Sequence, residues 1–111
     1  MLPVITVVNS HKTQEGEYIG RPSPLGNPYG WQDGHPEDLR VDTREEAIVC
    51  YDMWIQSHLR TGTPRVLNEL DRLAQIALRD GKLTLRCWCS PKPCHGDVIR
   101  EVLLQAIEAN Q

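Results

Sequence analysis

The stretch Leu83–Gln105, LTLRCWCSPKPCHGDVIREVLLQ, predicts a buried strand, a Pro-containing turn and an amphipathic helix in succession. Apolar residues at every second position from Leu83 indicate a strand that runs to Trp88 and buries one face. We expect the helix to begin around Gly96. Its inward residues would be Val98, Ile99, Val102, Leu103, Ala106 and Ile107. Three of the four cysteines lie in this stretch, so it joins a core strand to the densest group of reactive side chains in the chain.

Other elements are predicted upstream of this stretch. The run VITVVN at Val4–Asn9 is typical of a strand buried on both faces, and Glu17–Gly20 is expected to add a brief second strand or hairpin arm. A capping box at Thr43–Glu46 starts a helix that should end near Gly62. The pair Thr63-Pro64 starts the next helix, which ends at Asp80-Gly81. The apolar stripe of that second helix is Val66, Leu67, Leu70, Leu73, Ala74, Ala77 and Leu78.

A long loop separates the first strand from the helices. Gly20–Pro36, GRPSPLGNPYGWQDGHP, holds four of the eight glycines and four of the eight prolines, and neither a helix nor a central strand tolerates that density. Leu25, Tyr29 and Trp31 supply groups that can pack, which favours an ordered loop over a disordered linker. Long ordered loops in small domains are often functional.

The order strand, loop, helix, helix, strand, helix predicts one α/β domain spanning residues 1–111. We expect a small Rossmann-like three-layer sandwich with a short, partly parallel sheet. In such sheets the loops that follow the strands gather at one edge, where ligands bind. The loop at residues 10–36 and the turn at residues 90–95 should therefore meet there.

Composition limits the classes of partner. The chain of 111 residues is 40% hydrophobic and 24% charged, with a formal net charge of -3. That charge disfavours bulk binding of nucleic acid, which needs a basic surface. The apolar run Leu2–Val8 is too short for a signal or membrane segment, so we expect a cytoplasmic protein without a membrane partner. Three apolar helix faces exceed what a small sheet covers, which is compatible with a homodimer.

The loop and the first strand end supply candidate ligand-binding residues. Arg21 offers a bidentate cation, and a hydroxyl, an amide and a glycine follow it within a few residues, a set that suits phosphate or carboxylate. Aromatic rings close to them could stack on a base or another ring. The predicted ligand-binding residues are Asn9, His11, Arg21, Ser23, Gly26, Asn27, Tyr29, Trp31 and Gly96.

The cysteine-rich turn permits three interpretations. Cys87, Cys89, Cys94 and His95 are soft ligands of the kind that tetrahedral zinc prefers, although their spacing is not that of a standard zinc knuckle. Alternatively, the start of a helix would lower the thiol pKa of Cys94 and leave it as a catalytic thiolate with His95 as base. The third interpretation is a packed turn without chemistry, in which Cys87 is a small core residue in phase with Leu83.

Three segments together resemble one family. They are YIGRPSPLGNPY at Tyr18–Tyr29, REEAIVCYDMWI at Arg44–Ile55 and CWCSPKPCHGDVI at Cys87–Ile99, and VVNSH at Val7–His11 extends the match. The chain is similar to the small uncharacterised proteins of bacteria and their phages known as domain of unknown function DUF4326. The resemblance implies no settled activity. Small phage proteins of this kind often act on nucleotides or counter host defences.

We therefore expect a site for a nucleotide-like or other phosphorylated small molecule at the carboxyl edge of the sheet. One alternative is a thiol- or His-dependent enzyme that uses Cys94 and His95 on a nucleotide-type substrate in the same pocket. The other is a zinc-stabilised module that binds a host or phage protein. No cofactor other than zinc is expected.

Overall fold

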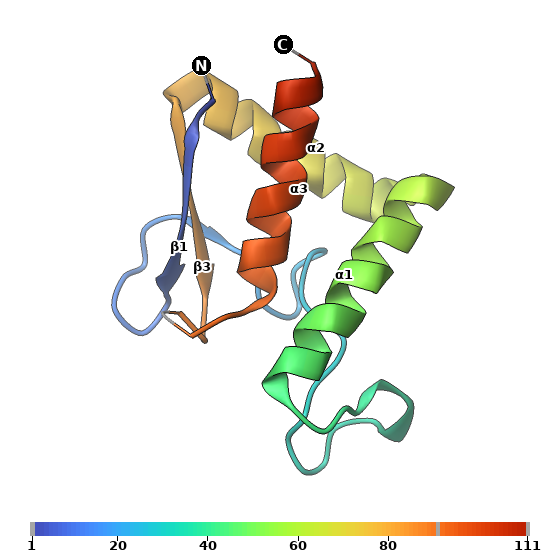
Figure 1. The fold of residues 1–111 in the computed structure, drawn as a ribbon. Helices are drawn as coiled ribbons and strands as arrows, with labels where there is room; N and C mark the ends of the chain where they lie inside the picture. The colour runs from blue at the N-terminus through green and yellow to red at the C-terminus, as the bar shows by residue number, and fades with distance from the viewer. Residues whose placement is uncertain (1, 91, 111) are drawn as a thin grey trace.

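A computed structural model of the chain describes residues 2–90 and 92–110. Figure 1 shows the arrangement of its helices and strands. In chain order they are β1 (Val4–Asn9), β2 (Glu17–Tyr18), the short 3-10 helix η1 (Glu37–Leu39), α1 (Arg44–Thr61), α2 (Pro64–Asp80), β3 (Lys82–Cys87) and α3 (His95–Ala109). The predicted mixture of helices and a small sheet is confirmed. No helix within the described residues combines the length and the hydropathy that crossing a membrane requires.

The sheet is parallel throughout, with strand order β1-β3-β2. Along β1 and β3 the register runs from Val4 opposite Lys82 to Asn9 opposite Cys87. Paired residues of parallel strands share a face, so Ile5 and its partner Leu83 both point into the core, where each is buried. The alternation predicted for β3 is confirmed.

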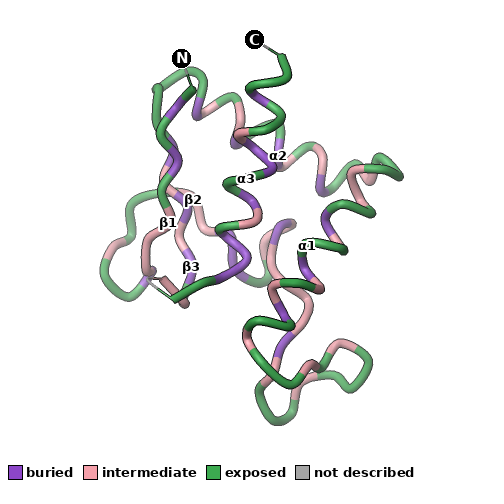
Figure 2. Tube along the Cα trace, in the orientation of Figure 1, coloured by how far each residue is buried: buried purple, intermediate pink, exposed green. Residues whose placement is uncertain are grey.

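The structure has two layers where the sequence predicted three. All three helices lie on one side of the strands, and Figure 2 shows the buried residues between them. The prediction that β1 is buried on both faces is wrong, since Val4 is 64% exposed. The other side of β3 is crossed by the connection between β1 and β2, where the Arg86 guanidinium donates to the carbonyl of Gly16 at 3.2 Å. A three-stranded sheet with every helix on one face leaves the other face to that loop.

The helix boundaries follow local signals. The Thr43 hydroxyl accepts the amide of Glu46 at 3.1 Å, as the capping box predicts. Gly62 and Gly81 end α1 and α2 with φ of 72° and 74°, the left-handed conformation that favours glycine. Thr63 precedes α2 as expected, but its hydroxyl bonds Nδ1 of His58 at 2.7 Å and caps no helix amide.

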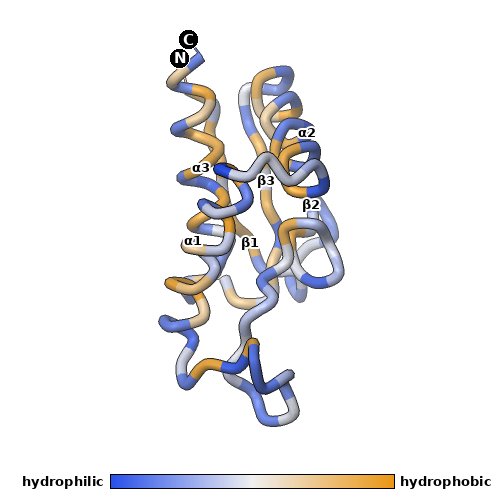
Figure 3. The backbone as a smooth tube through the Cα atoms, turned by 90° about the vertical axis from the view of Figure 1, so that its right-hand side faces the viewer, coloured by the Kyte–Doolittle hydropathy of each residue, from blue (hydrophilic) through white to orange (hydrophobic). Residues whose placement is uncertain are grey.

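Two residues outside the helices complete the core. Ile19 directly follows β2, and Leu25 lies in the loop at residues 20–36, called the Gly/Pro loop below; their exposures are 1% and 0%. The Tyr51 hydroxyl donates to the carbonyl of Leu25 at 2.6 Å and so fixes the loop to α1. Hydrophobic residues along the three helices alternate with hydrophilic ones in Figure 3. Leu78 and Ala106, predicted to face inward, are exposed instead.

We predict that Leu25→Ala lowers the free energy of unfolding by about 2–5 kcal/mol, because it removes a fully enclosed side chain. Leu78→Ala is the matched control. This helix residue is 52% exposed, and its loss should cost less than about 1 kcal/mol. Urea unfolding followed by circular dichroism measures both. Equal costs for the two variants would show that the loop does not pack into the core as described.

Candidate functional site

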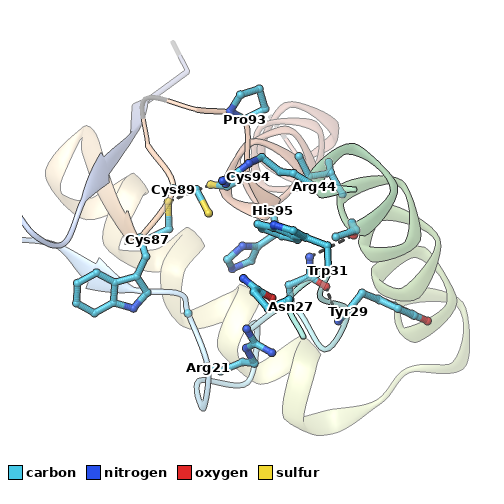
Figure 4. A pocket seen from close by; sticks show the side chains of 15 residues that line it. Arg21, Asn27, Tyr29, Trp31, Arg44, Cys87, Cys89, Pro93, Cys94 and His95 are labelled. Carbon is cyan, nitrogen blue, oxygen red and sulfur yellow. Dashed lines mark hydrogen bonds between the residues drawn. The ribbon is translucent and has the colours of Figure 1, made fainter. Parts of the chain in front are cut away.

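The predicted meeting of two loops at the carboxyl edge of the sheet is confirmed. The Gly/Pro loop, the start of α1 and the turn between β3 and α3 enclose a pocket of about 210 Å³ (Figure 4). Eight of the residues predicted for ligand, catalytic or metal roles line it: Arg21, Asn27, Tyr29, Trp31, Cys87, Cys89, Cys94 and His95. A ligand contact at each remains a prediction.

The first-strand candidates, Asn9 and His11, do not line this pocket. The Asn9 amide donates to the carbonyl of Ser90 at 2.7 Å, and its oxygen accepts the backbone amide of His11 at 2.7 Å. Asn9 therefore ties the end of β1 to the turn after β3. The His11 ring lies on the exposed Trp88, with ring centroids 4.5 Å apart.

Three other candidates are also absent from the pocket lining: Ser23, Gly26 and Gly96. They stabilise the loop backbone or allow close packing of the chain instead. The Ser23 hydroxyl accepts the amide of Leu25 at 3.3 Å. A side chain at Gly26 would begin 2.9 Å from the backbone of Arg21, and one at Gly96 would begin 2.9 Å from Val7. Both glycines are thus required by close packing.

Hydrogen bonds hold the loop part of the pocket in shape. The Asn27 side chain donates to the carbonyl of Ala47 on α1 at 3.2 Å and accepts the amide of Tyr29 at 2.9 Å. His35 donates from Nε2 to the carbonyl of Pro28 at 2.8 Å, so its Nδ1 can accept Arg21 at 3.4 Å. The side chain of Asn27 is therefore engaged with the backbone, whereas Arg21 keeps further donors.

Arg44 is a pocket residue that the sequence reasoning missed. It is the first residue of α1, and its guanidinium carbon lies 4.7 Å from the centroid of the Trp31 ring. Figure 4 shows it extending over Trp31 toward the turn that carries Cys94. Its Nη1 is buried and has no hydrogen-bond partner among residues 2–90 and 92–110. A cation on the first turn of a helix opposes the helix dipole, and that mismatch was the available signal.

The charge of the pocket differs in sign from that of the chain. The formal net charge is -3, yet the charged side chains among the described lining residues are Arg21 and Arg44, with no carboxylate. No carboxylate among the described residues therefore lines the pocket beside either guanidinium. This local field favours an anion.

The thiols of Cys87 and Cys94 form a close pair, with their sulfur atoms 3.0 Å apart. The hydrogen bond from Cys94 and the amides of Cys89 and Ser90 lower the pKa of Cys87 to about 6. Donation to Cys87 and burial raise the pKa of Cys94, and the amide of Gly96, at 3.3 Å, offsets little of this. The hydrogen bond between the two sulfurs favours one thiolate shared by the pair, and the role of Cys94 as a catalytic thiolate stays a prediction.

The buried His95 side chain connects the start of α3 to the segment after β2. It is 8% exposed, and Nε2 donates to the carbonyl of Ile19 at 2.7 Å, which places the proton on Nε2 of the neutral ring. Burial is the main reason that its pKa falls below the ordinary value of 6.5. The ring also lies edge-on to Tyr51, with centroids 5.0 Å apart. This bond holds the start of α3 against the segment after β2.

The predicted zinc ligands do not assemble. Among the described residues, no group of three or more His, Cys, Asp or Glu side chains is placed to hold a metal ion. Cys87 and Cys94 face each other, while the Nε2 of His95 is engaged by a carbonyl. The donor set therefore does not fit the tetrahedral site that zinc prefers.

Comparison with known proteins agrees with the resemblance seen in the sequence. Residues 7–105 match the model of the family described as Domain of unknown function (DUF4326). The chain is also 30% identical over 97 residues to an uncharacterized 12.4 kDa protein in the nrdA-td intergenic region of Enterobacteria phage T4, covering 87% of this chain and 75% of that protein. No solved structure matches.

We predict that the buried His95 makes the protein less stable in mild acid. The unfolded chain takes up a proton near the ordinary histidine pKa of 6.5, while the folded chain takes it up only at lower pH. Stability should therefore fall as the pH drops from 7 to 5, by at most about 1.4 kcal/mol per pH unit from this residue.

His95→Gln keeps an N–H that can donate to Ile19 and removes the titrating ring. Urea midpoints of both chains, measured between pH 7 and pH 5, isolate the contribution of His95 as their difference. Parallel losses of stability in the two chains would contradict the prediction.

Proposed function

We propose that this chain, which belongs to the family described as Domain of unknown function (DUF4326), binds a nucleotide-like or other phosphorylated small molecule in the pocket at the carboxyl edge of its sheet. The observation that carries the proposal is the buried, unpartnered Nη1 of Arg44 in the pocket wall, within the part of the chain that the structure describes. A buried donor without an acceptor is costly, and an anionic oxygen would satisfy it.

The position of Arg44 adds to this argument. Stability alone favours an acidic or neutral residue on the first turn of a helix, as Glu45 and Glu46 illustrate in the same turn. An arginine there is unfavourable for two reasons: its charge opposes the helix dipole, and its buried Nη1 has no hydrogen-bond partner among the described residues. Such local conflicts with folding are expected where a residue serves a ligand.

The second arginine would complete the anion site. In Figure 4 Arg21 approaches from the Gly/Pro loop, across the pocket from Arg44. Its side chain bonds His35 at 3.4 Å, a long contact that leaves most of its donors available. Two guanidinium groups from different elements can grip a phosphate from two sides, which fixes its orientation as well as its charge.

The size of the pocket limits the ligand. Pockets for drug-sized molecules usually measure about 300–1,000 Å³. A pocket of about 210 Å³ suits a phosphate with one attached ring or sugar better than a dinucleotide. Tyr29 and Trp31 line it and offer aromatic surface for that ring, although Arg44 already covers one face of the Trp31 indole.

The geometry gives less support to catalysis by Cys94 and His95. The Cys94 thiol is directed to Cys87, and the Nε2 of His95 is directed to Ile19, so the two side chains do not form a nucleophile and its base. We therefore assign the pocket a binding role, in the cytoplasm, where thiols stay reduced.

We predict that Arg44→Met and Arg21→Ala each weaken ligand binding at least about 10-fold, since each removes a charge-assisted contact. Arg60→Met, at an exposed position of the same helix α1, is the matched control and should bind like the wild type. Thermal shifts are measured with nucleoside monophosphates, ribose 5-phosphate, inorganic phosphate and uncharged nucleosides.

The phosphorylated compounds should raise the melting temperature of the wild type, and the nucleosides should not. Absence of a shift with every phosphorylated compound would remove the main support for the proposal. An equal loss in Arg60→Met would assign the effect to general charge and not to the pocket.

A further inference from the structure

The Cys87–Cys94 pair has a feature that anion binding does not use. Its sulfur atoms are 3.0 Å apart, and the two residues are only 1% and 2% exposed. A disulfide bond needs a separation of about 2.05 Å, so the sulfurs are within about 1 Å of bonding distance. Cys87 is the last residue of β3, and Cys94 is the N-cap residue of α3.

Backbone amides act on both sulfurs. Those of Cys89 and Ser90 help to lower the pKa of the Cys87 thiol, and the amide of Gly96 donates to the sulfur of Cys94 at 3.3 Å. Amides directed at a sulfur stabilise its thiolate, which is the reactive form. A pair held only for packing would need no such donors.

Access to the pair is selective. Both cysteines line the pocket, so a small solute that enters the pocket lies next to them. Their low exposure keeps the bulky disulfide of another protein away. A small hydroperoxide satisfies both conditions, because it is compact and neutral.

We propose that Cys87 and Cys94 are a reversible redox pair that forms an intramolecular disulfide when a small hydroperoxide enters the pocket. The Cys87 thiolate attacks a peroxide oxygen; the O–O bond breaks and leaves a sulfenic acid, while the leaving oxygen takes up a proton. The Cys94 sulfur then attacks the Cys87 sulfur. The S–S bond forms, the sulfenic oxygen leaves as water, and the proton of the Cys94 thiol is consumed.

The balance is two thiols and one hydrogen peroxide giving one disulfide and two waters. Two electrons pass from the sulfurs to the peroxide, and a dithiol reductant returns them. This pairing is independent of the phosphorylated ligand proposed above, since it requires only the two sulfurs and an open pocket.

The test uses the full chain. Protein reduced with dithiothreitol is freed of reductant and treated with an equimolar amount of hydrogen peroxide. Free thiols are then alkylated, and the product is examined by intact and fragmentation mass spectrometry. Fragmentation is necessary because trypsin leaves Cys87, Cys89 and Cys94 in one peptide, ending at Arg100. We expect two alkyl groups on the oxidised chain where the reduced chain carries four, together with a Cys87–Cys94 link and full reversal by dithiothreitol.

Single variants locate the reaction. Cys50→Ser retains the pair and should oxidise like the wild type, whereas Cys94→Ser should stop at a sulfenic acid on Cys87 that dimedone traps. Oxidised wild-type protein should also melt about 5–10 °C higher, because the link closes a loop in the unfolded chain.

Other results would overturn the proposal. A link from Cys89, sulfinic acid on Cys87 without a disulfide, or four thiols that stay reduced would each do so. Release of stoichiometric zinc on oxidation, detected with a colorimetric chelator, would assign the sulfurs to a metal instead. Since the disulfide is read directly in the wild type, failure of a variant to fold leaves the result decisive.

Discussion

The Tyr51 side chain is the contact on which the arrangement of this protein depends. Its hydroxyl donates to the carbonyl of Leu25, its ring stacks on Trp54 at 5.3 Å, and the edge of His95 meets it at 5.0 Å. One fully buried residue thus joins the Gly/Pro loop, α1 and the start of α3. Burial raises the pKa of its hydroxyl well above the usual value, so the hydroxyl remains a donor. Because the loop is held there, the arginine and aromatic residues that follow one another in it line one pocket.

The pocket concentrates a positive field in a protein whose overall charge is negative. Net charge describes solubility and long-range steering, but a ligand in a partly enclosed site responds to the few charges that line it. Arg44 has a buried nitrogen that no described residue satisfies, and its place on α1 opposes the helix dipole. Neither feature stabilises the fold. The same residue lies over Trp31, so recognition of an anion and of a flat ring would be coupled through one side chain.

Two contacts fix the turn between β3 and α3: the thiol pair of Cys87 with Cys94, and the hydrogen bond from His95 to Ile19. The strand pleat turns Cys87 inward with Leu83 and Leu85, and Cys94, the N-cap residue of α3, lies against it. His95 is adjacent to Cys94 in the chain, yet its ring is used to bond Ile19. Three of the four potential zinc ligands are therefore divided between two structural tasks. Proximity in the chain brought the two sulfur atoms of Cys87 and Cys94 together, but it did not bring the His95 ring nitrogen to them.

The sequence by itself determined the helices, the two longer strands and the edge at which the site lies. Alternation in Leu83–Cys87, the threonine before α1 and the glycines after α1 and α2 act within a few residues, and so they are readable from the chain. The family was also readable, because its motifs span most of the chain and residues 7–105 match its model.

The tertiary structure alone decided the layering, the role of Arg44 and the partner of each sulfur. Val4–Asn9 has an apolar run that suits a strand covered on two faces, but every helix packs on the same side, and Val4 stays exposed. Arg44 and Trp31 belong to different elements, as do Cys87 and Cys94. Which side chains meet across such elements depends on packing between segments distant in the chain. Local propensity contains no information about that packing.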